Sequence, residues 1–210
     1  MIEVRPPAAR GDLVAAAGEG SPVIGLIDGV FHHSLAVTPR EVREAAALGV
    51  RLFGGASMGA LRAVECPDAM TGLGEIHAAF ARGELADDDE VAVTFDPRDH
   101  EVVAYPLVQI RAVMGQLDRE HPAAARALAS YLDRIRGLPF FERTRPRLRD
   151  LARPLQREGI AWPAIERWLD DDRTDIKRRD AAVVIATVHA AWLKQDHGRA
   201  LSTPIRSQDP

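Results

Sequence analysis

The first hundred residues alternate between short apolar runs and amphipathic segments that are bounded by turn residues. The runs at 23–29 and 50–54 are continuous and have the length of strands, as is typical of parallel strands covered on both faces. Between them, Thr38 is the expected N-cap of a helix, Glu41 completes a capping box, and Gly49 ends the helix. A strand, a helix and a second strand in this order predict a βαβ unit with parallel strands.

The second half of the chain has the periodicity of helices. Two more helices are expected near 58–66 and 73–82, followed by a hairpin of 91–95 with 102–105. Further helices are expected at about 107–118, 122–135, 144–157, 163–170 and 174–196. The pattern predicts an α/β fold with a small parallel-sheet core that contains a strand-to-helix turn like a nucleophile elbow. The core spans 1–105, a helical half at 106–201 packs on it as one structural unit, and 202–210 form a flexible tail.

Composition narrows the class of protein. The 210 residues are 46% hydrophobic and 28% charged, which are values of a globular chain. A net charge of −4 lacks the basic excess of nucleic-acid-binding proteins. The start of the chain lacks the apolar core of a signal peptide, and the longest apolar stretch, 181–193, is too short to span a bilayer. We therefore expect a cytoplasmic protein with no nucleic-acid or membrane partner. All basic residues except Lys177 and Lys194 are arginines.

The segment Gly55-Ala56-Ser57-Met58-Gly59 has the Gly-x-Ser-x-Gly form of a nucleophile elbow. Such a turn exposes its serine at the carboxyl end of a strand, and its glycines allow backbone to approach closely. The N–H of Met58, at the start of the next helix, would be the first donor to an oxyanion. The alternative is a tight turn in which Ser57 caps that helix. The pattern alone does not choose between the two.

No histidine is placed for an ordinary catalytic triad, which disfavours a common serine esterase. Asp180 and His189 lie on one predicted helix, nine residues apart, so they could not easily join the same triad. A serine without a histidine can use a lysine as its base. Lys177 opens the same helix, and both Lys177 and Asp180 lie on or beside its apolar face, where charges need partners. The alternative is a solvent-facing helix start with Lys177 reaching out to water.

Asp28 closes the first strand, and ligands of open parallel sheets bind beyond the carboxyl ends of strands. If the two strands are neighbours, Asp28 and Ser57 emerge at the same edge, although Asp28 could also cap the following turn. Arg62 and Glu65, three residues apart, form either an ordinary surface ion pair or an arginine of the site with its acid.

Other polar residues are weaker candidates. Arg111 lies on a predicted helix, where a surface arginine is the simplest interpretation. The acidic run 87–90 could bind a metal, but a solvated loop or a cap before a strand is favoured. The pair His32–His33 lacks metal-ligand spacing to other histidines or to Cys66. We therefore expect no metal and no cofactor.

Several of these segments together resemble the TfuA-like family. The matching stretches contain the first strand end, the Ser-Met-Gly-Ala-Leu-Arg-Ala run, the acidic run and a late Asp-x-Lys-Arg-x-Asp-Ala motif; they are 24–29, 53–65, 87–93 and 175–181. The likeness is strong over about 10–110 and patchier afterwards.

The resemblance implies a function that spacing does not show. TfuA-like proteins accompany YcaO enzymes, which activate peptide amides with ATP so that sulfur replaces oxygen and a thioamide forms. Their substrates include ribosomally made natural-product peptides. The resemblance implies an accessory enzyme that hydrolyses the thiocarboxylated C-terminus of a ubiquitin-like sulfur carrier and so releases sulfide. The alternative is a non-catalytic adaptor that docks the carrier and activates the YcaO partner. The oligomeric state stays open, a homodimer included.

The resemblance also suggests roles for residues. Ser57 would be the nucleophile of a hydrolase, and Lys177 its base. Asp28 or Asp180 would orient Lys177. The residues expected to bind substrate, by holding the oxyanion or the anionic group, are Gly55, Met58, Arg62, Glu65 and Arg111.

Overall fold

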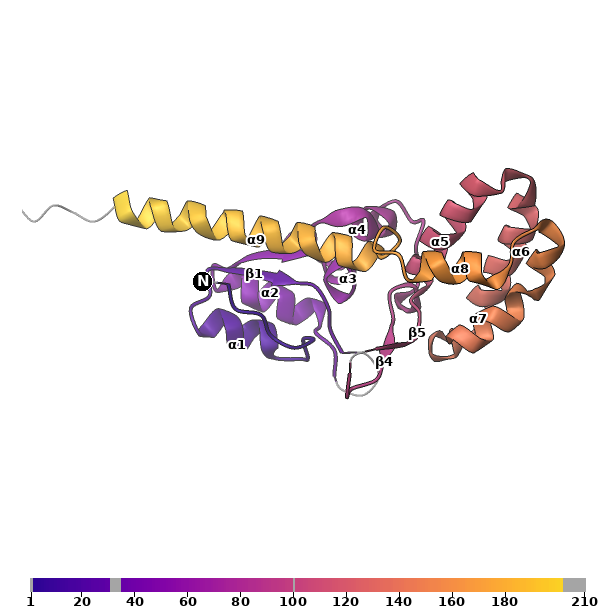
Figure 1. Cartoon of the computed structure of the whole chain (residues 1–210). Coiled ribbons are helices and arrows are strands. Elements are labelled where there is room, and N and C mark those ends of the chain that lie inside the picture. Colours follow the sequence, from indigo (N-terminus) through magenta and orange to yellow (C-terminus); the bar gives the residue numbers. More distant parts are fainter. Residues whose placement is uncertain (1, 31–34, 100, 202–210) are drawn as a thin grey trace, which may run out of the picture.

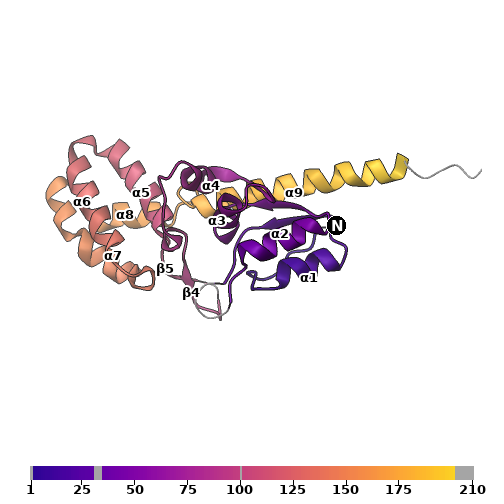
Figure 2. The same ribbon diagram turned by 180° about the vertical axis from the view of Figure 1, so that it is seen from behind.

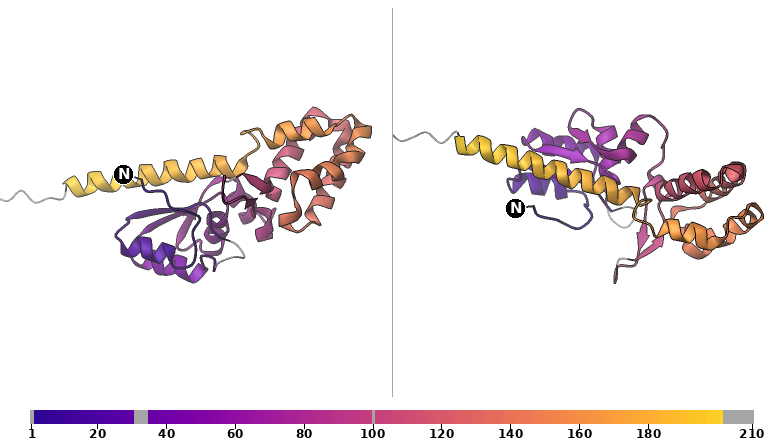
Figure 3. Two further views of the ribbon diagram at one scale, coloured as in Figure 1. Left: turned by 60° about the horizontal axis from the view of Figure 1, so that its bottom comes forward. Right: turned by 45° about the horizontal axis from the view of Figure 1, so that its top comes forward.

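The computed structural model describes residues 2–30, 35–99 and 101–201, with side chains as far as Lys194. The expected tail at 202–210 and the pair His32–His33 lie outside these residues. The described chain forms an α/β lobe and a helical lobe, and one long helix runs from the junction of the lobes along the α/β lobe (Figures 1 and 3). The predicted class, a small parallel α/β core with a helical half, is confirmed.

The sheet of the α/β lobe has three parallel strands in the order β1-β2-β3. They are β1 (Val23–Leu26), β2 (Arg51–Gly54) and β3 (Met70–Gly72). Leu26 pairs with Gly54, so the carboxyl ends of the two predicted strands meet at one edge. The sequence pattern missed β3, because three residues that include a glycine carry no recognisable strand period.

One face of the sheet packs on α1 (Asp12–Gly18), α2 (Pro39–Ala47) and α3 (Met58–Glu65). Leu26 and Leu52 contribute to this core, each 3% exposed. α1 and α2 lie side by side in the view from behind (Figure 2). The three helices are amphipathic or alanine-rich, so this layer is held by burial of their apolar sides.

The start of α2 differs in one respect from the prediction. The hydroxyl of Thr38 accepts the N–H of Glu41 at 3.2 Å, so Thr38 is the N-cap. Glu41 does not complete a capping box. Its carboxylate instead accepts the N–H groups of Gly11 at 2.8 Å and Leu13 at 3.0 Å, at the start of α1. The N–H groups at the start of a helix have no partner within it, so Glu41 caps α1 rather than its own helix, α2.

The other face of the sheet is covered by α9 (Ile176–Leu201), the last helix of the predicted helical half. Val184 and Val188 pack directly on Gly25 of β1, and Val184 also packs on Gly55. A Cβ atom at Gly25 would lie 2.8 Å from Val188 and 2.9 Å from Val184, so only glycine fits there. The strands are therefore largely apolar, because helices cover both of their faces. The polar residues in them, Arg51 and Thr71, are exposed.

Between the lobes the chain forms α4 (Gly74–Ala81), η1 (Asp88–Glu90) and the hairpin of β4 (Thr94–Phe95) with β5 (Val102–Ala104). The predicted hairpin is confirmed, but its first strand is shorter than expected. Residues 91–93 belong to the turn that follows η1, because Val91 and Ala92 are buried among helices rather than paired in a sheet.

The helical lobe follows the predicted segments closely. Its helices are α5 (Leu107–Glu120), α6 (Ala125–Arg136), α7 (Arg145–Ala152) and α8 (Trp162–Leu169), joined by the short turns η2 (Pro122–Ala124), η3 (Phe140–Glu142) and η4 (Arg153–Glu158). They enclose a core of their own, in which the Tyr131 hydroxyl donates to the carbonyl of Leu148 at 3.0 Å. No helix among the described residues has the length and apolar character needed to cross a membrane.

Gly59 sets how closely α3 approaches the sheet. A Cβ atom there would lie 1.8 Å from the carbonyl oxygen of Leu26 and 3.2 Å from the Cα of Gly54. We predict that Gly59→Ala lowers the free energy of unfolding by about 1–3 kcal/mol, because α3 must move away from the strands. Urea denaturation measures this change.

Gly18→Ala is the matched control for this variant. Gly18 is also helical, but a Cβ atom there meets nothing within 4 Å. Alanine is intrinsically better than glycine in a helix by up to about 1 kcal/mol, so the control should be neutral or stabilising. A Gly59→Ala protein as stable as wild type would show that the close contact is not needed.

Candidate active site at the carboxyl ends of the strands

The turn between β2 and α3 is strained. The N–H of Ser57 donates to the carbonyl of Gly55 at 2.8 Å and closes a three-residue turn around Ala56. Ala56 has a φ of 66°, and it is the one described non-glycine residue with a positive φ. This conformation costs about 1–3 kcal/mol and persists only where the surroundings enforce it. Such strain is common at functional sites.

The turn is fixed to the end of the neighbouring strand. Gly55 donates its N–H to the carbonyl of Leu26 at 3.2 Å, and Gly59 donates to that of Ile27 at 3.3 Å. β1 ends at Leu26, so Asp28 lies just beyond the strand, next to the residue that binds Gly59. Asp28 and the Ser57 turn therefore share one edge of the sheet, as the sequence predicted.

Ser57 does not cap α3. Its side chain makes no capping hydrogen bond, the residue is fully buried, and its Oγ has no hydrogen-bond partner among the described residues. Within the same part of the chain, no hydrogen bond uses the N–H of Met58. A buried hydroxyl without a partner costs about 1–3 kcal/mol. The turn thus holds a hydroxyl and a backbone donor that no contact within the described fold uses.

Lys177 reaches the same edge from the first turn of α9. Its Nζ donates to the carbonyl of Val91 at 3.0 Å and lies 3.7 Å from Oδ2 of Asp28. The lysine side chain is 15% exposed. Burial lowers the pKa of Lys177 below its ordinary value, and the Asp28 carboxylate opposes part of this shift. A lysine that deprotonates more easily is a better general base.

Asp28 and Asp180 have different tasks. Oδ2 of Asp28 lies 3.7 Å from Nζ of Lys177, and Oδ1 of Asp28 accepts the N–H of Gly29 at 3.0 Å. Asp180 is 2% exposed and accepts the N–H groups of Glu75 and Ile76 at 2.9 and 2.8 Å, which caps α4. Burial raises the pKa of Asp180, although these two hydrogen bonds oppose the shift.

Gly74, at the start of α4, makes this cap possible. It has a φ of +88°, and a Cβ atom there would lie 2.3 Å from the carboxyl carbon of Asp180. His77, one turn further along α4, places its imidazole ring against Gly72 at the end of β3. Burial lowers the pKa of His77, and the nearby Asp180 opposes this shift. Asp180 therefore ties α9 to α4, while the ion pair with Lys177 belongs to Asp28.

Arg62 and Glu65 form the ion pair that their spacing suggests. The arginine is not an ordinary surface residue, because its side chain is 15% exposed and its Nε donates to the carbonyl of Val37 at 2.6 Å. It fastens α3 to the segment before α2. Among the described residues, Nη2 of Arg62 makes no hydrogen bond, which leaves both N–H donors of this nitrogen unused.

Arg111 binds the acidic run. Its guanidinium donates to both carboxylate oxygens of Glu90, at 2.9 and 2.6 Å, and Glu90 is 4% exposed. Arg143, which the sequence did not single out, is fully buried and pairs with the carboxylate and carbonyl of Asp89. Arginines of the helical lobe thus bind Glu90 and Asp89, so this part of the run is a structural connection between the lobes and not a solvated loop.

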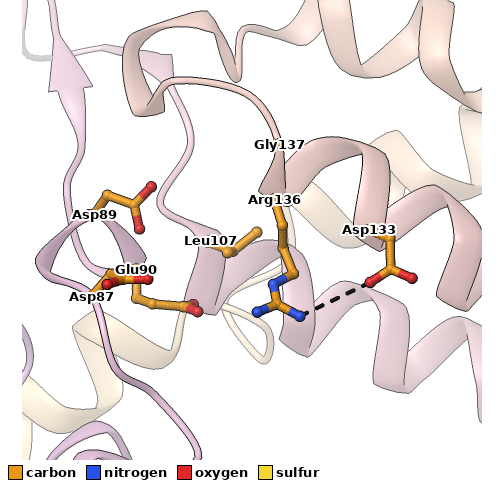
Figure 4. Close-up of a pocket in the computed structure, with 7 residues that line it drawn as sticks. All are labelled: Asp87, Asp89, Glu90, Leu107, Asp133, Arg136 and Gly137. Carbon is orange, nitrogen blue, oxygen red and sulfur yellow. Dashed lines mark ion pairs between the residues drawn. The ribbon is translucent and has the colours of Figure 1, made fainter.

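A cavity of about 300 Å³ lies beside this junction. Figure 4 shows the acidic run on one side of it and the side chains of α6 on the other. The cavity is lined by Asp87, Asp89, Glu90, Leu107, Asp133, Arg136 and Gly137. On the α6 side, Nη1 of Arg136 lies 3.9 Å from Oδ1 of Asp133, which is three residues earlier on the same helix.

The fold and the site define a small α/β protein with a strained strand-to-helix turn and a lysine–aspartate pair at the same edge of its sheet. The model of the TfuA-like protein family matches residues 28–144, which is more than half of the chain. The chain therefore belongs to the TfuA-like family. The matched region contains Asp28 and Ser57 but ends before Lys177. None of the curated proteins that were compared with the chain matches it.

The two lysines of the chain allow a direct test of the Lys177 environment. In protein with isotope-labelled lysine, we predict that the Lys177 side-chain signal titrates with a pKa below the ordinary 10.5, because the ammonium is buried. Asp28→Asn should lower this pKa further, because the carboxylate favours the charged form. Nuclear magnetic resonance follows both titrations.

Lys194 is exposed on the same helix and is the internal control, assigned by its loss in Lys194→Arg. The pKa of Lys177 is lower in the folded state than in the unfolded state, so the free energy of unfolding should rise with pH through that interval. Lys177→Met should abolish this rise. A Lys177 titration at the ordinary value would remove the support for a base at this position.

Proposed function

We propose that this protein hydrolyses the C-terminal thiocarboxylate of a ubiquitin-like sulfur carrier and supplies the sulfide to a YcaO partner for thioamide formation. The observation that carries the proposal is the unpaired, fully buried hydroxyl of Ser57 in a strained strand-to-helix turn. Strain and an unsatisfied hydroxyl both cost stability, which favours a chemical use of the turn over a structural one. Membership of the TfuA-like family supports the proposal, because the resemblance to that family implies this class of substrate.

In the first step, Ser57 Oγ attacks the carbonyl carbon of the thiocarboxylate, and the neutral amine of Lys177 takes its proton. The negative oxygen of the tetrahedral intermediate accepts the free N–H of Met58. The carbon–sulfur bond then breaks, and the ammonium of Lys177 returns a proton to sulfur, so that hydrosulfide leaves and an ester on Ser57 remains. Water hydrolyses this ester through the same lysine, giving the carrier carboxylate and free Ser57.

Asp28 and Val91 would position the base in this scheme. The Val91 carbonyl accepts one proton of Lys177, and Asp28 lies on the edge that holds the Ser57 turn. Arg62, with an unused Nη2 and with Glu65 fixing its other side, is the candidate to bind the anionic sulfur. Arg111 would act indirectly, because Glu90 occupies its guanidinium.

A second candidate function is a non-catalytic adaptor that docks the carrier and activates the YcaO partner. The observation that favours it is the full burial of Ser57, whose side chain must become accessible before it can attack a carrier. In this case the strained turn would serve only to shape the edge of the sheet. The two candidates differ in what the protein does without its partner.

We predict that the purified protein releases sulfide from thiocarboxylated carrier in the absence of the YcaO partner, ATP and peptide. Ser57→Ala should reduce this rate by at least about 1000-fold, as expected for loss of a nucleophile that works as one unit with its base. Ser130→Ala is the matched control, because Ser130 is exposed on α6 and should leave the rate unchanged. Full sulfide release by Ser57→Ala would overturn the nucleophile.

Lys177→Arg separates the charge of the lysine from its role as a base. An arginine keeps the positive charge beside Asp28 but does not deprotonate in proteins. We expect the wild-type rate to rise with pH through the lowered pKa of Lys177, and the Lys177→Arg rate to be low and without this rise. If no sulfide forms, yet thioamide formation from free sulfide still needs this protein, the adaptor is the function.

A further inference from the structure

A second cavity lies apart from the Ser57 turn, between α4, α5 and the first turn of α9. Its volume is about 410 Å³, within the range of small-ligand sites. The apolar side chains of its wall come from four separate segments and are Ile76, Ala79, Leu85, Val108, Ala112 and Ile176. All of these except Ala112 belong to one packed hydrophobic cluster, so the floor of the cavity is rigid rather than a gap between loops.

A glycine keeps this cavity open. Gly115 lies inside α5, where glycine costs up to about 1 kcal/mol relative to alanine. Neither packing nor backbone conformation requires it. Its φ is not positive, and a Cβ atom there would meet only Nη1 of Arg119, at an ordinary 3.9 Å. Because Gly115 lines the cavity, its missing side chain is what leaves room for a ligand.

The cavity wall also carries one uncompensated charge. Its charged residues are four arginines and two glutamates, namely Arg111, Arg119, Arg173, Arg179, Glu75 and Glu84. All of these except Arg119 form ion pairs within the described part of the chain. Arg119 makes no hydrogen bond or ion pair with any described residue, and its guanidinium lies over Gly115. An unpaired arginine beside an apolar floor suits a ligand that has both an anionic group and an apolar body.

We propose that this cavity binds an apolar carboxylate, whose apolar body lies against Ala79, Ala112 and Ile176, the apolar residues of the wall that are only half-buried. The carboxylate accepts hydrogen bonds from Arg119, because a guanidinium matches a carboxylate with two parallel donors. A free organic acid and the C-terminal apolar residue of a polypeptide both present this chemistry. The site does not depend on the reaction proposed for Ser57.

The test uses four probes on the full chain: phenylbutyrate, neutral phenylbutanol, N-acetylglycyl-leucine and the amide of that peptide. Calorimetry measures the affinities, and methyl resonances of Ala79, Ala112 and Ile176 locate the ligand. The two carboxylates should bind at least about tenfold more tightly than their neutral counterparts. Arg119→Gln should remove this preference and leave the neutral probes unchanged. Arg126→Gln, at an exposed position of α6, is the matched control.

Gly115→Leu separates loss of the cavity from loss of the fold. Leucine fills open space and favours a helix, so this variant should unfold at a higher urea concentration than wild type and yet bind no probe.

The relative affinity of the two acids identifies the source of the ligand. Tighter binding of the peptide acid than of phenylbutyrate would identify the C-terminus of a polypeptide, and tighter binding of phenylbutyrate would identify a free organic acid. Failure of all probes, equal affinity for acid and neutral probe, or resonance shifts away from the floor would overturn the proposal. Sulfide release by Ser57 is expected to be the same in wild type, Arg119→Gln and Gly115→Leu, so this site and the hydrolase can fail separately.

Discussion

The close packing of α9 on the glycines of the sheet is the contact on which the rest of the structure depends. Val184 and Val188 fit against Gly25, and Val184 also touches Gly55, at positions where any side chain would collide. This contact brings the end of the chain back to its beginning. It covers the second face of the sheet, and it places Lys177 beside Asp28 and Asp180 at the first turn of α4. The candidate site therefore exists only when the long helix is docked.

A second set of contacts links the helical lobe to the same edge. Arg111 and Arg143 hold Glu90 and Asp89, and the next residue, Val91, accepts a hydrogen bond from Lys177. Three consecutive residues thus connect two arginines of one lobe, of which Arg143 is fully buried, to the lysine of the other. The arginine partners matter for stability, because a buried carboxylate without its cation is strongly unfavourable. Asp89 and Glu90 therefore form the ionic connection between the lobes.

Much of the fold and part of the site follow from local patterns in the sequence. Continuous apolar runs identified β1 and β2, and amphipathic segments identified the helices, because these periods reflect which faces are buried. The strand-to-helix turn at Ser57 and the position of Asp28 on the same edge also followed from order along the chain. β3 was missed because it is too short to show a period, and Glu41 was assigned to its own helix because a local cap and a distant cap use the same residue types.

The sequence by itself determined the class of fold, the turn that carries Ser57 and the family of the protein. Only the tertiary structure decided that the Ser57 hydroxyl caps nothing, that Asp28 is the partner of Lys177, and that Asp180 caps α4. It also revealed that Arg143 is buried against Asp89 and that Gly115 opens a cavity. The physical reason is distance along the chain. Secondary structure depends on neighbours a few residues away. The contacts of Lys177 with Asp28 and of Asp180 with the start of α4 join residues more than one hundred positions apart, and no local period predicts such contacts.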